Sequence, residues 1–189
     1  WTLIVADVAQ LEPRVLAAMA HDRAMAKAGS GADLYAGIVE SGAVDTRAHA
    51  KIAVLGAMYG ATTGESGRLV PRLSRVFPDA MRLVDEAALA GERGETVTTW
   101  LGRSSPAPGS RWHEVQSQAS QPDATAVDER RARQAARDRG RFTRNFVVQG
   151  TAAEWALCWM ADIRLRLAAL DPVPHASGAT RSGPSFSQR

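Results

Sequence analysis

The 189-residue chain contains very little cysteine and few aromatic residues. Cys158 is its single cysteine, and aromatic side chains make up 6% of the sequence. One thiol forms neither a disulfide nor a thiolate zinc site within a chain, so both are excluded and a reducing compartment is expected. The four histidines are scattered without the spacing of metal ligands, which indicates surface or hydrogen-bonded side chains.

Long apolar runs are also missing. No segment approaches the roughly 20 apolar residues that cross a bilayer, and no signal peptide is visible, so no membrane partner is expected. The sequence opens on Trp1, inside an apolar segment and without an initiator methionine. This start predicts an internal fragment of a longer protein.

The abundant residues favour helices and anionic partners. Hydrophobic residues make up 45% and charged residues 23% of the chain, with much alanine, which is typical of a globular and mainly helical protein. The formal charge is +3 and the pI is about 9.6. Arginine greatly outnumbers lysine, and a guanidinium group binds phosphate through two parallel hydrogen bonds.

Residues 2–7 combine β-branched and apolar side chains and end on Asp7. This pattern predicts a buried strand that places a carboxylate at its C-terminal end. Because side chains alternate along a strand, Leu3 and Val5 would pack in the core while Asp7 faces a cleft. A surface acid at the end of an ordinary strand explains the same residues equally well.

Most of the remaining chain shows helical spacing of apolar residues, interrupted by glycine and proline. Asp33 and the pair Asp45–Thr46 are suited to cap two of the helices. A short strand is expected at residues 95–101, a mobile loop at 104–126 and a flexible tail at 171–189. Helices are expected over residues 12–28, 33–39, 47–60, 62–75, 80–90, 130–144 and 152–170.

The helix expected at residues 47–60 carries the most informative face. Arg47, Lys51, Leu55 and Tyr59 follow one another at intervals of four residues, so they lie on one side of the helix. Two cations, an apolar residue and an aromatic residue share that side. A solvated charged face also accounts for the two cations and, without further context, is the preferred interpretation.

A basic segment follows near the end of the chain. Seven arginines lie between Arg130 and Arg144, with Asp138 as the one acid in that interval. A run of charged residues usually forms a solvated face. At this density of arginines, binding to a phosphate backbone is an equally good interpretation.

Three patterns occur in order along the chain. They are Asp7-x2-Gln10-x-Glu12-x-Arg14, Arg47-x3-Lys51-x7-Tyr59-Gly60, and Arg141-x3-Asn145-x3-Gln149-Gly150-Thr151. Together they resemble the first palm motif, the fingers-helix motif and a later DNA-contacting motif of family A DNA polymerases, the class of bacterial DNA polymerase I. The variant motifs and the alanine- and arginine-rich composition are similar to those of actinobacterial proteins named as bifunctional exonuclease/polymerases.

The resemblance implies an α+β fold that is mostly helical, namely part of the palm and the fingers of a right-hand polymerase. The implied parts are a palm segment at residues 1–35, fingers at 36–103, a flexible loop at 104–128, a basic helix and a return helix at 129–170, and a truncated linker at 171–189. It further implies a monomer in the bacterial cytoplasm, associated with the nucleoid and acting in DNA replication or repair.

The implied reaction adds deoxynucleotides to a primer 3′ end by two-metal phosphoryl transfer. Asp7 would bridge two Mg²⁺ ions, together with the carbonyl group of Val8. Arg47 and Lys51 would neutralise the phosphates of the incoming deoxynucleoside triphosphate.

The resemblance also assigns substrate and DNA contacts. Gln10 would lie on the triphosphate side, Glu12 would act as a steric gate at the sugar 2′ position, and Tyr59 would stack near the templating base. Leu55 stands where the family has an aromatic residue, which puts sugar discrimination in doubt. Residues assigned to the primer-template DNA are Arg14, Arg141, Asn145 and Gln149.

One expected motif is missing from the sequence. No His-Asp-Glu strand, which would carry the second metal-binding carboxylate, follows the last helix. The chain is therefore expected to be inactive alone. The alternative is a nonenzymatic DNA-binding remnant of such a polymerase. A third interpretation, a plain helical interaction domain, would require the three ordered matches to be a coincidence.

Overall fold

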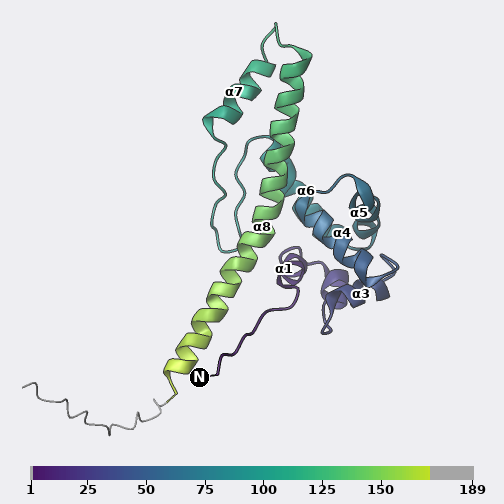
Figure 1. Ribbon diagram of the computed structural model, residues 1–189, viewed down its shortest axis with the longest axis vertical. Helices are drawn as coiled ribbons and strands as arrows, with labels where there is room; N and C mark the ends of the chain where they lie inside the picture. Colours follow the sequence, from purple (N-terminus) through teal and green to yellow (C-terminus); the bar gives the residue numbers. More distant parts are fainter. Residues whose placement is uncertain (1, 171–189) are drawn as a thin grey trace, which may run out of the picture. The chain divides into compact units, whose positions relative to one another are not determined.

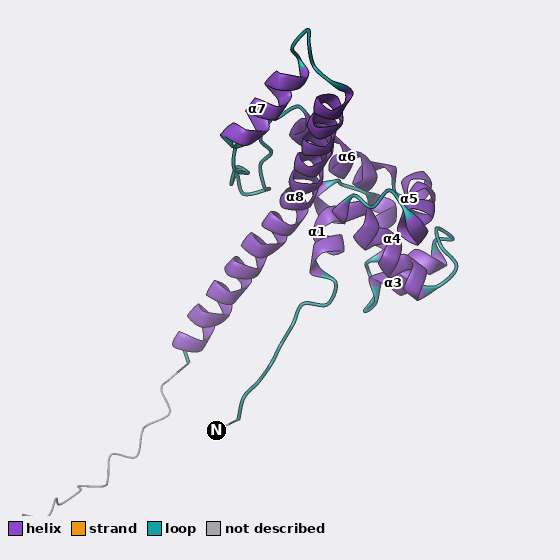
Figure 2. Ribbon diagram, turned by 45° about the horizontal axis from the view of Figure 1, so that its top comes forward, coloured by secondary structure: helices purple, strands orange, loops and turns teal. Residues whose placement is uncertain are grey.

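The computed structural model describes residues 2–170, and every regular element in this range is a helix (Figures 1 and 2). By compactness the chain divides into two units, residues 1–155 and 156–189, and helix α8 runs from the first into the second. The helices are α1 (Leu11–Met19), α2 (Arg23–Ala28), α3 (Leu34–Glu40), α4 (Arg47–Tyr59), α5 (Gly64–Val76), α6 (Pro78–Glu92), α7 (Ser110–Ala119) and α8 (Ala126–Ala168).

The predicted α+β fold is wrong, because residues 2–170 contain no sheet. Thr98 and Ser104 form an isolated antiparallel bridge in place of the strand expected at residues 95–101. Residues 2–7 are extended but unpaired, and Leu3 and Val5 are 92% and 93% exposed. A strand needs a neighbour for its backbone N–H and C=O groups, and no described segment supplies one here.

The core of the first unit is built around α4. This helix packs against α3, α5 and α6, and its small or compact residues Ala50, Ala53, Val54 and Ala57 are completely buried. They recur at intervals of three and four residues, which places them on one side of the helix. The opposite face, with Arg47 and Lys51, is left to solvent.

The predicted caps of two helices are confirmed. The side chain of Asp33 accepts a hydrogen bond from the backbone N–H of Tyr35 at 3.0 Å and begins α3. The hydroxyl of Thr46 accepts one from the N–H of His49 at 3.1 Å and begins α4. Each cap satisfies an N–H group that has no partner within its own helix.

The helix expected at residues 12–28 is divided into α1 and α2. Asp22, which is 2% exposed, causes the interruption. Its carboxylate accepts hydrogen bonds from the backbone N–H groups of Met25 at 2.9 Å and of Ala80 at 3.1 Å. One side chain thus caps α2 and fixes the first turn of α6, which a continuous helix would not allow.

The C-terminal helices also differ from expectation. The two helices expected at residues 130–144 and 152–170 are one helix, α8, because Gly150 does not interrupt it. The flexible loop expected at residues 104–128 contains α7, which lies beside the first part of α8 (Figure 1). The tail expected at residues 171–189 lies outside the described residues.

Close approach of α6 and α8 depends on glycine. A Cβ at Gly91 would lie 2.8 Å from the carbonyl oxygen of Arg139, and one at Gly140 would lie 2.9 Å from that of Ala88. Both distances are shorter than a normal van der Waals contact. Each helix therefore presents a glycine to the backbone of the other.

Within residues 2–170, none of the helices has the length and apolarity needed to cross a membrane.

Candidate functional site

The face predicted on α4 exists, and its two ends have different environments. Arg47 is the first residue of the helix and its side chain is 58% exposed. Lys51 is exposed one turn later, whereas Leu55 packs partly against the core. Tyr59 ends the helix and is 48% exposed. The N-terminal half of this face can therefore receive an anion from solvent.

Asp33 joins the first pattern of the sequence to the second. Its Oδ2 forms an ion pair with Nε of Arg47 at 2.5 Å, and its Oδ1 accepts a hydrogen bond from Nε2 of Gln10 at 3.0 Å. The side-chain oxygen of Gln10 in turn accepts the N–H of Leu34 at 2.8 Å. Gln10 and Arg47, 37 positions apart in the sequence, are thus held by one carboxylate.

Tyr35 and Glu12 complete this group. The guanidinium carbon of Arg47 lies 5.5 Å from the centre of the Tyr35 ring. Burial raises the pKa of the Tyr35 hydroxyl, and the negative charge of Glu12 raises that pKa further. The carboxylate of Glu12 therefore acts electrostatically on the Tyr35 hydroxyl. We call Gln10, Glu12, Asp33, Tyr35 and Arg47 the Asp33 cluster.

The sequence predicts Asp33 as a helix cap, but it does not predict Asp33 as the centre of this cluster. The available signal was its position at the start of α3, 14 residues before Arg47. The 13 residues between Asp33 and Arg47 form one helix and a loop, and the spacing alone gives no geometric information without the fold.

The Asp33 cluster makes stability depend on pH in a defined direction. The hydrogen bond from Arg47 holds the pKa of Asp33 below its usual value of 3.8. A lowered folded-state pKa stabilises the fold above the unfolded-state value, and this contribution is lost as pH falls through the folded-state value. We expect Asp33→Asn to lower the free energy of unfolding by a constant amount from pH 5 to 7.

Urea unfolding of both proteins across pH 2–7 measures this difference. The gap between wild type and Asp33→Asn should begin to close below about pH 4. A gap that persists unchanged at the lowest pH would contradict the ion pair with Arg47 as its source.

Arg14 has a structural role in this structure. Its guanidinium donates to the backbone carbonyls of Ala9 at 3.1 Å, Gly31 at 3.1 Å and Ala32 at 3.3 Å, and also to that of Gly29. These bonds fix the loop that leads into Asp33. Contact of Arg14 with DNA stays a prediction.

The C-terminal end of α4 meets the third pattern of the sequence on α8. Nε2 of Gln149 donates to the hydroxyl of Tyr59 at 3.4 Å. Gly60 ends α4 in the left-handed conformation, with φ 71°, and a Cβ there would lie 3.0 Å from Cγ of Arg141. Nη1 of Arg144 donates to the carbonyl of Ala57 at 2.7 Å. The second and third patterns are therefore in contact.

The seven arginines of the basic segment do not share one role. Arg144 pairs with Asp85, its side chain is 14% exposed, and burial lowers its pKa. Arg139 donates to the carbonyl of Pro106 at 2.5 Å, and burial lowers its pKa also. The five exposed members, which we call the α8 arginines, are Arg130, Arg131, Arg133, Arg137 and Arg141. Asn145 is half-buried on the same helix.

The predicted metal ligands are Asp7 and Val8, and their role stays a prediction. Asp7 is exposed on the extended segment before α1, and Val8 beside it is half-buried. Among residues 2–170, no three His, Cys, Asp or Glu side chains lie close enough together to hold a metal ion. Mg²⁺ is bound in proteins through carboxylates and other oxygen ligands, and Asp7 supplies one of the two carboxylates that the resemblance implies for two ions.

The chain was compared with known proteins. A scan against protein-family models and a search of curated proteins gave no match.

Proposed function

We propose that this chain is the nucleotide-binding part of a template-directed DNA polymerase of family A. The supporting observation is that the three patterns behind the resemblance are linked by side chains. Asp33 connects Gln10 to Arg47, and Tyr59 at the other end of α4 contacts Gln149. Side-chain contacts thus join segments that are far apart in the sequence and that carry the three patterns.

In this proposal the triphosphate binds at the N-terminal half of α4. Asp33 accepts a hydrogen bond from Nε of Arg47. The two terminal nitrogens of Arg47 have no hydrogen bond to the described residues. Lys51, one turn later, supplies a second positive charge. A guanidinium fork and an ammonium group on one face suit adjacent phosphate groups.

Primer-template DNA binds along α8 in this proposal. Arg141 and Gln149 lie against the C-terminal end of α4, so in this proposal the DNA meets the end of α4 opposite to the one that binds the triphosphate. Contacts to phosphate and sugar accept any sequence. The two-metal reaction is proposed only for a protein that places a second carboxylate beside Asp7, and no step is assigned to the metals here.

Lys51→Ala tests the proposal directly. We expect the variant to bind a fluorescent deoxynucleoside triphosphate at least about tenfold more weakly, because a hydrogen bond to a charged group contributes about 1.5–3 kcal/mol. Its affinity for a primer-template duplex should stay within about twofold. Equilibrium fluorescence titrations of both ligands measure the two effects.

The matched control is Lys27→Ala, which removes the other lysine of the chain from an exposed position on α2. This change has the same effect on net charge and should leave triphosphate binding unchanged. Equal losses in the two variants would show a general charge effect and would sink the proposal. Loss of duplex affinity in Lys51→Ala would place this residue on the DNA.

A nonenzymatic DNA-binding function is the second candidate, and the exposure of the α8 arginines favours it. Both candidates predict duplex binding with a slope of log affinity against log salt of about −0.9 per phosphate contact. They differ in triphosphate binding, which a DNA-binding remnant has no reason to retain. Wild-type protein that binds duplex but no triphosphate would support this second candidate.

A further inference from the structure

A cavity of about 620 Å³ lies between α7 and the first part of α8. Nε2 of Gln116 on α7 donates to the carbonyl of Ala132 on α8 at 2.9 Å and ties the two helices together. Gly94 receives the indole of Trp112, since a Cβ there would lie 2.6 Å from the ring. Pockets for small organic ligands fall in the same range of volumes, about 300–1,000 Å³.

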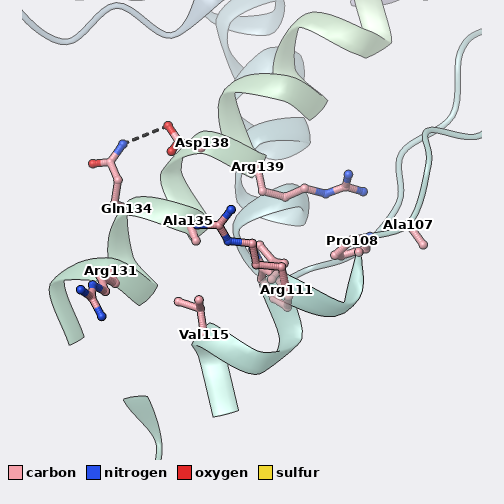
Figure 3. A pocket seen from close by; sticks show the side chains of 11 residues that line it. Ala107, Pro108, Arg111, Val115, Arg131, Gln134, Ala135, Asp138 and Arg139 are labelled. Atoms are coloured by element: carbon pink, nitrogen blue, oxygen red, sulfur yellow. Dashed lines mark hydrogen bonds between the residues drawn. The ribbon is translucent and has the colours of Figure 1, made fainter. Parts of the chain in front are cut away.

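The walls of the cavity combine apolar surface with positive charge. Figure 3 shows Arg111 and Val115 of α7 on one side and Arg131 and Ala135 of α8 on the other. Asp138 is the one acid of the lining. It accepts a hydrogen bond from Gln134 at 2.9 Å and pairs with Arg141 outside the cavity, so its charge is offset.

Two buried donors of the lining have no acceptor. They are Nε1 of Trp112 and Nε of Arg139, and neither has a hydrogen-bond partner among the described residues. An unsatisfied buried N–H group is costly and is rare in folded proteins. Both atoms are inaccessible to solvent, so the accessible lining is set by Arg111, Arg131 and the apolar side chains, which suit a ligand with negative charge and an apolar face.

We propose that this cavity binds single-stranded nucleic acid, with one unstacked base inside and the neighbouring phosphates on Arg111 and Arg131. A base offers a flat apolar face to Val115 and Ala135. Proteins that bind single strands combine a cationic groove with side chains, most often aromatic, on which bases stack; here the contacting side chains are aliphatic. A duplex keeps its bases stacked, so it cannot deliver one into the cavity.

This site is separate from the one proposed for the triphosphate. It is built from α7 and residues 131–139 of α8, whereas the Asp33 cluster and Lys51 belong to α1, α3 and α4. The proposal stands whether or not the chain is part of a polymerase. Its test uses a ligand and variants that leave the α4 face unchanged.

The test is binding of a fluorescent 20-nucleotide oligothymidylate, followed by anisotropy from 50 to 200 mM salt. Arg111→Gln should weaken binding and reduce the salt slope by about 0.7, the value for one contact to a single strand. Ala135→Leu should narrow the cavity and weaken binding about tenfold, because it obstructs the base without changing the charge or adding an aromatic ring on which a base could stack. Duplex affinity should be unchanged in both variants.

Arg68→Gln is the matched control, since it removes one exposed arginine from α5, away from the cavity. Circular dichroism verifies the fold of each variant, and Arg111→Gln keeps the test valid if Ala135→Leu fails to fold. Equal effects of Arg111→Gln and Arg68→Gln would overturn the proposal. So would equal competition by unlabelled duplex and unlabelled single strand.

Discussion

Gly37→Ala is expected to destabilise the protein by about 3 kcal/mol, at the upper end of the range for overpacking. Gly37 lies in α3, where that helix crosses the end of α2. A Cβ at this position would lie 2.7 Å from the carbonyl carbon and 2.9 Å from the Cα of Ala28, and closer still to its carbonyl oxygen. All three atoms belong to the backbone, so no side chain can rotate to make room and the two helices must separate.

Urea unfolding followed by circular dichroism measures this effect, and Gly31→Ala is its control. Nothing lies within 4 Å of a Cβ at Gly31, so alanine there should be neutral or stabilising by up to about 1 kcal/mol through the unfolded chain. Equal midpoints for the two variants would show that α2 and α3 are not packed as described.

The same substitution should also affect the Asp33 cluster. Asp33 caps α3, and Gly37 lies one turn further along that helix. A shift of α3 away from α2 moves the Asp33 carboxylate relative to Arg47, which belongs to another helix. We therefore expect Gly37→Ala to weaken triphosphate binding even at temperatures where the variant remains folded.

Local features of the structure could be predicted from the sequence. Asp33 and Thr46 were recognised as caps because a short polar side chain before an apolar helical pattern satisfies the first N–H groups of a helix. The exposed face with Arg47 and Lys51 followed from the helical repeat alone. Both depend on interactions within about one turn of the chain.

Features that depend on distant partners could not be predicted in this way. Residues 2–7 have strand-forming side chains, but strand formation requires an edge elsewhere, and Ile4 is 90% exposed. Gly150 was expected to precede a new helix, yet α8 continues through it, and a Cβ there would lie 2.7 Å from Cγ2 of Thr99 in a distant segment. The break at Asp22 likewise depends on the N–H of Ala80, 58 positions away.

The basic segment shows that the distribution of charge over a surface has the same dependence on distant partners. Seven arginines in one interval predicted one electrostatic surface, whereas the structure turns Arg139 and Arg144 inward to backbone carbonyls. Their neighbours Arg137 and Arg141 face solvent. Sequence gives the number of positive charges, but only the fold shows which of them remain available for a phosphate.

Arg144 is the inward arginine whose loss should cost most. Ala57 belongs to the last turn of α4, where carbonyl groups have no donor within the helix, and Nη1 of Arg144 supplies one at 2.7 Å. Its positive charge also lies favourably at the negative end of the helix dipole. The same guanidinium pairs with Asp85 of α6, so one side chain joins three helices.

Arg144→Gln is expected to lower the free energy of unfolding by about 2–3 kcal/mol, the value of hydrogen bonds to a charged group at a largely buried position. Asp85 contributes little to this loss because its side chain is 56% exposed and water can replace its partner. Arg144→Lys should recover only part of the stability, since an ammonium group lacks the fork that spans both acceptors.

Arg137→Gln provides the control for Arg144→Gln in the same urea unfolding experiment. Arg137 is exposed on the same helix and donates to the side chain of Gln134 at 2.9 Å, so its loss should change stability by less than about 0.5 kcal/mol. Arg144→Gln should in addition loosen the contact between Tyr59 and Gln149, and thereby weaken primer-template binding. If Arg144→Gln and Arg137→Gln have equal stability, Arg144 does not hold the end of α4, and α4 and α8 are joined by other contacts.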